Sequence, residues 1–148
     1  MKIFKIVLFC LVTSLVSCSK DNPTSNNNSN SGTDGFFYAE NGATATQTVS
    51  TPYANATFKS IFAVHNGATV VEINLSSLAV GSYTIDNATN VLTYLKPGSN
   101  AMWLGTSGSV TITANANNKL SGSFSIPTGT GITGVNSLSG TFTNIPIQ

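Results

Sequence analysis

The chain has 148 residues, of which only 7% are charged, and its six lysines and five acidic residues give a net charge of +1 without any arginine. Binding of nucleic acid needs a stripe of basic side chains that neutralises phosphates, so a chain this poor in cations excludes nucleic acid as a partner. The length allows one domain with a sizeable core in addition to a targeting segment.

The first residues have the pattern of a secretory signal peptide. Met1, Lys2 and Lys5 make a short positive region, and an uncharged apolar run follows from Ile6 to Val16. A transmembrane helix needs about 20 apolar residues, so this run is too short to span a bilayer. We expect a cleaved signal peptide over residues 1–17.

The end of this leader carries a cysteine in a distinctive context. Leu15-Val16-Ser17-Cys18 resembles the bacterial lipobox. The resemblance implies cleavage before Cys18 and transfer of diacylglycerol and fatty acyl chains such as palmitate to this residue. Two or more chains hold a protein stably on a membrane where one is marginal. The alternative is an ordinary secretory leader with an incidental cysteine.

The next segment, 19–34, is rich in Asn and Ser and has no large apolar side chain. Such a composition predicts that residues 18–34 form a lipidated cysteine with a disordered tether, which reaches about 55 Å when extended. Its start, Cys-Ser-Lys-Asp-Asn, resembles the lysine-plus-acid export signal of Bacteroidota lipoproteins. The resemblance implies an outer-membrane protein on the cell surface, with a periplasm-facing protein as the alternative. Cys10 leaves with the leader, so no free thiol is expected.

Residues 35–148 have the rhythm of a single all-β domain, an antiparallel β-sandwich or a flattened barrel. Short segments rich in Val, Ile, Thr, Phe and Tyr alternate with turn-forming residues. Asn41-Gly42 and Asn66-Gly67 suit tight turns with positive φ, and they predict two hairpins, 36–40 with 43–49 and 57–65 with 69–75. Further strands are expected at 82–85, 91–95, 101–105, 109–114, 120–126 and 139–145.

One motif occurs twice near the end of the chain. Leu120-Ser-Gly-Ser-Phe124 is echoed by Leu138-Ser-Gly-Thr-Phe142, and each copy predicts a strand that bends at glycine and turns its phenylalanine inward. Here the chain resembles small Bacteroidota lipoproteins of unknown function, whose domains open with an aromatic strand and an Asn-Gly-type turn and close with two Gly-(Ser/Thr)-Phe strands. The matching segments are FFYAENG, SGSFSI and SGTFTNIPI. The resemblance implies a β-sandwich lipoprotein and supplies no activity.

Two features invite a catalytic interpretation. Residues 129–134 spell the dinucleotide fingerprint GxGxxG, which works only where a strand turns into a helix and an acid follows on the ribose. This segment joins two predicted strands and no acid follows, so we interpret it as a glycine-rich loop. His65, the only histidine, would need a nucleophile and an orienting carboxylate, and we expect an exposed histidine at a strand end. No catalytic residue is assigned.

Metal ligation has little support in the sequence. A transition-metal site usually gathers several His, Cys or carboxylate ligands, whereas the acids Glu40, Glu72 and Asp86 are scattered. Around Asp86, carbonyl oxygens of Asn87 and Asn90 leave calcium open as an alternative to a simple polar turn. We expect no metal and no cofactor.

The aromatic residues are the remaining candidates for a ligand site. Tyr38, Tyr94 and Trp103 on an uncharged sheet suit stacking on sugar rings, and the simpler interpretation is that they fill the core. The sequence therefore predicts a non-catalytic, lipid-anchored surface module that binds a glycan, a small ligand or an envelope protein. The alternatives are a structural subunit that pairs through an edge strand and a hydrolase that uses His65.

Overall fold

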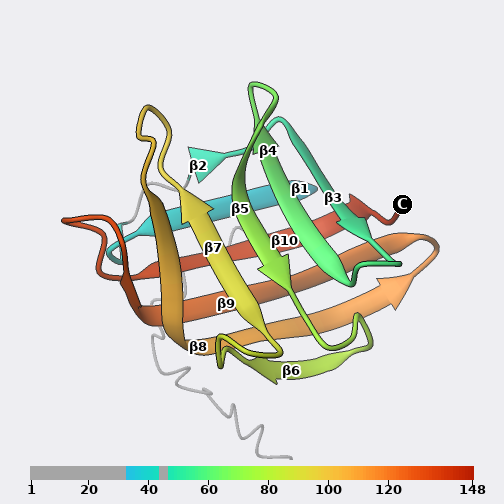
Figure 1. Cartoon of the computed structure of the whole chain (residues 1–148). Helices are drawn as coiled ribbons and strands as arrows, with labels where there is room; N and C mark the ends of the chain where they lie inside the picture. The colour runs from blue at the N-terminus through green and yellow to red at the C-terminus, as the bar shows by residue number, and fades with distance from the viewer. Residues whose placement is uncertain (1–32, 44–46) are drawn as a thin grey trace, which may run out of the picture.

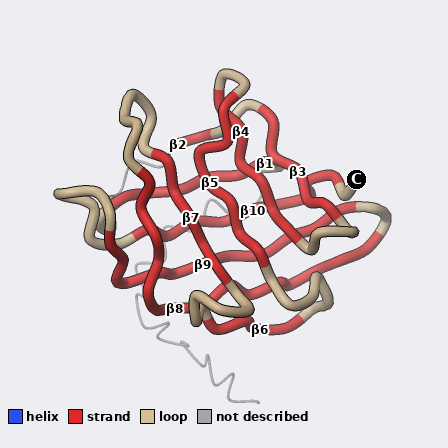
Figure 2. Tube along the Cα trace, in the orientation of Figure 1, coloured by secondary structure: helices blue, strands red, loops and turns tan. Residues whose placement is uncertain are grey.

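A computed structural model describes residues 33–43 and 47–148 of the chain (Figure 1). The predicted signal peptide, Cys18 and nearly all of the predicted tether lie outside the described residues. Within the described part the chain forms strands and turns and no helix (Figure 2). The prediction of an all-β domain is therefore confirmed.

The strands, in chain order, are β1 (Gly35–Glu40), β2 (Gln47–Thr48), β3 (Thr51–Asn55), β4 (Ser60–His65), β5 (Ala68–Asn74), β6 (Gly81–Thr84), β7 (Val91–Leu95), β8 (Met102–Ala116), β9 (Lys119–Thr130) and β10 (Leu138–Pro146). They form one antiparallel sheet in the order β2-β1-β10-β9-β8-β7-β5-β4-β3, and β6 pairs with β8 off this path. The sheet curls into a half-barrel, so that β4, β5 and β7 cross in front of β1, β10 and β9 (Figure 1). A parallel bridge between Ala54 and Ile147 joins β3 to the C-terminal end of the chain.

Both predicted Asn-Gly turns are present. Asn41 and Gly42 have φ of 55° and 68°, and Asn66 and Gly67 have φ of 50° and 79°. Positive φ at both central residues is the type I′ geometry, whose twist matches that of the flanking strands. The first hairpin is shorter than predicted in its described part, since β2 holds only Gln47–Thr48, and residues 44–46 lie outside the described residues.

Strand β3 was not predicted, and its presence moves the start of the next strand. Pro52 cannot donate a ladder hydrogen bond and counts against a strand, but β3 lies at the end of the sheet order, where a proline is tolerated. β4 begins at Ser60 and not at Thr57, because the intervening residues make the turn from β3. In that turn, the amide of Phe58 donates to Asn55 Oδ1 over 3.0 Å.

The predicted strands 101–105 and 109–114 are one continuous strand, β8, with irregular register between Gly105 and Ser109. Gly108 has φ of 117°, and a Cβ there would lie 2.2 Å from the carbonyl oxygen of Ser125. Only glycine therefore fits at this position. The irregularity lets the first part of β8 pair with β7 and the second part with β6.

The repeated Leu-Ser-Gly-x-Phe motif has a structural explanation. β9 and β10 are antiparallel, and their register sets Gly122 opposite Phe142 and Phe124 opposite Gly140. A Cβ on Gly122 would lie 2.5 Å from the ring of Phe142, and a Cβ on Gly140 would lie 2.5 Å from the ring of Phe124. Each phenylalanine therefore covers the glycine of the other copy, a known way to support glycine within a sheet.

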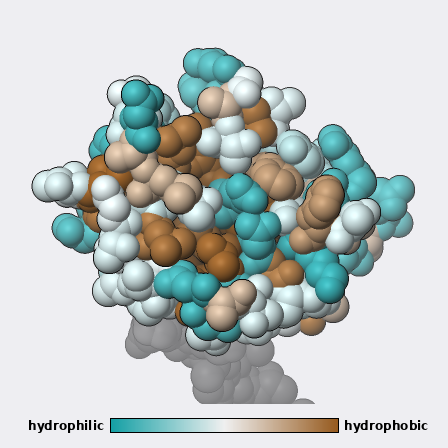
Figure 3. Space-filling model, viewed as in Figure 1, coloured by the Kyte–Doolittle hydropathy of each residue, from teal (hydrophilic) through white to brown (hydrophobic). Residues whose placement is uncertain are grey.

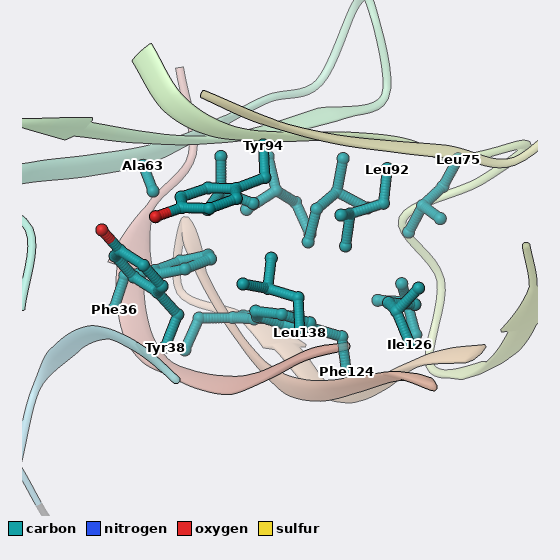
Figure 4. Close-up of a cluster of buried hydrophobic side chains, with 14 of the residues drawn as sticks. Phe36, Tyr38, Ala63, Leu75, Leu92, Tyr94, Phe124, Ile126 and Leu138 are labelled. Carbon is teal, nitrogen blue, oxygen red and sulfur yellow. The ribbon is translucent and has the colours of Figure 1, made fainter. Parts of the chain in front are cut away.

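The core fills the space between the two layers of the curled sheet (Figure 4). Side chains from β4 and β7 face those from β1, β9 and β10, and Leu75, just after β5, joins them. Side chains alternate along β5, since Val71 and Ile73 are fully buried while Glu72 between them is partly exposed. The largest fully buried side chains are Trp103, Tyr38, Tyr94, Phe36 and Phe142.

Candidate functional site

The outer face of the front layer carries a row of side chains that crosses five strands. The register pairs Tyr53 of β3 with Phe62 of β4, Phe62 with Glu72 of β5, Glu72 with Thr93 of β7 and Thr93 with Leu104 of β8. All five side chains are partly exposed, whereas the residues that flank them along each strand are buried, with the exception of Pro52. Strand alternation thus sets two aromatic rings, a carboxylate, a hydroxyl and an aliphatic side chain in one line.

Tyr53 and Phe62 form an aromatic platform at one end of this row. Their ring centroids are 4.9 Å apart and the ring planes are inclined by 26°. Offset-stacked rings at this separation stabilise each other beyond the area that they bury. The pair therefore presents partly exposed aromatic surface in a fixed orientation.

Beside the platform, Glu72 is held by a chain of hydrogen bonds. Ser60 Oγ donates to Asn74 Oδ1 over 2.5 Å, and Asn74 Nδ2 donates to Glu72 Oε1 over 3.0 Å. The other carboxylate oxygen, Oε2, has no hydrogen-bond partner among residues 33–43 and 47–148. A carboxylate with one oxygen fixed and the other unbonded is an acceptor ready for a hydroxyl or amide donor.

A shallow hollow of about 170 Å³ lies next to Glu72 and Thr93 on the same face, and its other lining residues are Thr69, Val70, Leu95 and Met102. Figure 3 shows hydrophilic and hydrophobic surface side by side on the face seen in Figure 1. Pockets that enclose whole small molecules are typically about 300 Å³ or larger. This hollow is too small to enclose a ligand, so a ligand here would lie along the sheet and place one part in the hollow.

The three aromatic residues singled out by the sequence lie in the core and not on this face. Tyr38, Tyr94 and Trp103 are at most 2% exposed. The rings of Tyr38 and Tyr94 face each other across the half-barrel, with centroids 5.5 Å apart (Figure 4). Trp103 Nε1 donates to the carbonyl of Val135 over 2.8 Å. These three residues therefore belong to the core. Each ring is packed against other side chains, and its polar atom has a hydrogen-bond partner within the protein.

Tyr94 belongs to a polar cluster at the mouth of the core. Its hydroxyl donates to Glu40 Oε1 over 2.5 Å, and Lys96 Nζ lies 2.6 Å from Glu40 Oε2. Burial raises the pKa of Tyr94, and the hydrogen bond to Glu40 raises it further. Burial alone would raise the pKa of Glu40, but the hydrogen bonds from Lys96 and Tyr94 and the positive charge of Lys96 lower it overall. The cluster ties β1 to β7 across the half-barrel.

The features with a catalytic or metal-binding interpretation remain apart from this cluster. His65 ends β4 opposite Ala68, and its side chain makes no hydrogen bond to a carboxylate or hydroxyl of the described residues. The segment 129–134 ends β9 and leads by turns towards β10, so it does not begin a helix, and Gly129 packs against the ring of Trp103. The described ranges hold no group of three His, Cys, Asp or Glu placed to bind a metal ion.

The loop at 86–90 is a polar turn built on one carboxylate. Asp86 Oδ1 accepts hydrogen bonds from the amides of Ala88, Thr89 and Asn90 at 2.8–3.0 Å. These bonds, the one from Asn90 first, lower the pKa of Asp86. The Asn90 side chain accepts from the amide of Ser76 and donates to the carbonyl of Thr84. Asp86 and Asn90, two of the three residues considered for calcium, therefore already make hydrogen bonds within the protein.

The sequence pattern did not identify Tyr53 as a candidate site residue, and it gave Phe62 no role in a site. Alternation along β4 does place Phe62 on the face opposite Ile61, but its stacking partner belongs to the unpredicted strand β3. The usable signal was the pair of aromatic residues that flanks the β3–β4 turn at 53 and 62. A hairpin across 56–59 would have paired them.

Comparison with known proteins identifies a family for this chain. A family model described as a domain of unknown function (DUF6252) matches residues 42–146, which include strands β2 to β10. No curated protein and no solved structure matches the chain. The described residues include no helix of the length and hydropathy that spanning a membrane requires.

Proposed function

We propose that this chain, which belongs to the DUF6252 family, is a lipid-anchored envelope protein that binds glycan through the outer face of β3, β4, β5, β7 and β8. The anchor is Cys18, acylated in the manner of Bacteroidota lipoproteins, and the domain stands on the outer surface of the outer membrane. The lipobox and the lysine-plus-acid segment after it support this location.

The observation that carries the glycan proposal is the Tyr53–Phe62 platform beside Glu72. Sugar rings offer apolar C–H faces for stacking on aromatic rings and hydroxyl groups that donate to carboxylate oxygens. The row supplies both at fixed positions, with the rings stacked at 4.9 Å and the carboxylate held by Asn74. Preorganised groups bind more tightly because little side-chain entropy is lost on binding.

Pairing with a partner through the edge strand β3 receives less support from the geometry. Pro52 removes a donor from β3, and the backbones of Ala54 and Ala56 already bond with Gln148. The part of this edge that offers a full set of ladder groups is therefore short. Hydrolysis has no support beyond the presence of His65.

The test uses the soluble chain from Ser19 onwards on an array of envelope and dietary oligosaccharides, followed by calorimetric titration of the best ligand. We expect Phe62→Ala and Tyr53→Ala to weaken binding about tenfold each, equivalent to about 1.4 kcal/mol. Phe58→Ala is the matched control, because Phe58 is 72% exposed in the adjacent turn and outside the row. Absence of binding to any glycan, or equal losses in all three variants, would contradict the proposal.

A further inference from the structure

One corner of the molecule differs in character from the rest of the surface. The β3–β4 turn, the β5–β6 loop, the β8–β9 hairpin and the C-terminus lie on the same side in Figure 1. They surround an open hollow of about 440 Å³, lined among others by Ala56, Lys59, Leu78, Ala79, Asn118 and Ile147. These loops and the C-terminus together form the corner.

The corner exposes large apolar side chains. Phe58 is 72% exposed and Val80 is 63% exposed, and each is the chain neighbour of a residue that lines the hollow. The third exposed large hydrophobic residue of the described ranges, Met102, belongs to the outer face. Exposed apolar side chains that gather at one place mark contact with a partner or a membrane.

Positive charge gathers at the same corner. Lys59 lines the hollow and Lys119 follows the β8–β9 turn, and both are exposed. The one ion pair of the described ranges joins Lys96 to Glu40 at the mouth of the core, so neither corner lysine is neutralised in that way. The negative groups nearby, Asp34 and the C-terminal carboxylate of Gln148, accept hydrogen bonds from Asn144 and from the amide of Ala56. The two lysines are therefore the groups of this corner that an anionic headgroup can contact.

The polypeptide also enters the domain at this corner. Gly35 pairs with Thr143, and Asp34 bonds with Asn144. Three residues further on, Ile147 donates its amide to the carbonyl of Asn118 in the β8–β9 hairpin. The chain that leads from Cys18 thus reaches the domain next to the apolar and basic loops.

We propose that the corner rests on an anionic lipid bilayer, with Phe58 and Val80 in the interface and Lys59 and Lys119 at the headgroups. This inference rests on the proposed anchoring at Cys18. Aromatic and aliphatic side chains flanked by lysine are the combination that binds membrane interfaces. A tether holds the domain at a high effective concentration near the lipid, so a contact too weak to capture a free domain suffices to orient an anchored one.

The test couples the chain from Cys18 to Gln148 through its single thiol to a maleimide lipid in vesicles of phosphatidylethanolamine, phosphatidylglycerol and brominated phosphatidylcholine. Tryptophan is introduced by Phe58→Trp, by Val80→Trp or, as the control, by Asn100→Trp. Asn100 is exposed in the β7–β8 turn, at the opposite end of β8 from the β8–β9 hairpin of the corner. Buried Trp103 is common to all variants, and the unsubstituted chain gives its contribution.

We expect bromine quenching to be roughly threefold stronger for Phe58→Trp and Val80→Trp than for Asn100→Trp. Adding Lys59→Gln and Lys119→Gln should reduce that difference. Equal quenching at the three positions, or a difference that survives loss of both lysines unchanged, would overturn the proposal. The maleimide lipid takes the place of acylation in the cell. An unmodified Cys18 in cells would therefore contradict the proposed function, whereas the quenching experiment would still test the contact between the corner and the bilayer.

Discussion

Gly140→Val is expected to destabilise the domain by about 3 kcal/mol or more, the largest effect of any substitution considered for this protein. A Cβ on Gly140 would lie 2.3 Å from the carbonyl oxygen of Phe37 and 2.5 Å from the ring of Phe124. The backbone of β10 cannot move away from Phe37 without breaking its pairing with β1, so the substitution strains the sheet itself. Denaturant unfolding followed by circular dichroism measures the change in the free energy of unfolding.

The control for this substitution is Thr141→Val, which adds the same side chain one position further along β10. Thr141 is partly exposed on the opposite face of the strand, and a β-branched residue suits a strand there. We expect a change within about 0.5 kcal/mol. A Gly140→Val variant as stable as Thr141→Val would contradict the interlocked packing of β9 and β10.

Glu40→Ala is expected to lower the free energy of unfolding at pH 7 by about 1–3 kcal/mol. The substitution leaves the buried hydroxyl of Tyr94 without its acceptor and removes the partner of Lys96. The ion pair itself adds little, since the Lys96 side chain is 43% exposed and screened by water. Most of the lost stability therefore comes from the Tyr94 hydroxyl, which is left buried without an acceptor.

The pH dependence of Glu40→Gln separates the charge from the hydrogen bond. The folded-state pKa of Glu40 lies below the ordinary value of 4.5, so ionised Glu40 stabilises the fold above that pH, and this stabilisation is lost as the pH falls through the folded-state value. The difference in stability between the parent and Glu40→Gln should therefore shrink below pH 4.5. A gap in stability that does not change with pH for Glu40→Gln would refute the stabilising role of the Glu40 charge.

Local chemistry made parts of the fold predictable. The two Asn-Gly turns were found because a tight hairpin needs positive φ at two positions, and asparagine and glycine adopt it at little cost. Alternation of apolar and polar residues along β5 and β8 marks Val71, Ile73, Val110 and Ile112 for the core, where all four are buried. The echo of Leu-Ser-Gly-x-Phe located two strands, although their mutual pairing appears only when register is known.

The remaining features of the fold depend on how strands pair in the sheet, which local sequence does not reveal. β3 was missed because Pro52 argues against a strand, and only the position of β3 at the end of the sheet makes that residue acceptable. Without β3 there was no register to bring Tyr53 onto Phe62, so the exposed platform could not be recognised. Tyr94 meets Glu40 across 54 positions of the chain, a contact that depends on how far the sheet curls.

The aromatic residues illustrate the same limit. Composition alone allows Tyr38, Tyr94 and Trp103 to form a sugar-binding surface, although filling the core is the simpler interpretation. Curling of the sheet turns all three inward and leaves Tyr53 and Phe62 outside. Which aromatic ring is available to a ligand is therefore a property of the closed fold and not of local sequence.

The proposals for the outer face and for the corner both place the domain at a membrane through Cys18. Intact-mass spectrometry of the protein extracted from the membranes of its own cells tests that attachment most directly. We predict an N-terminus at Cys18 that carries the added mass of diacylglycerol and fatty acid. An unmodified thiol, or a chain that still begins at Met1, would contradict the account.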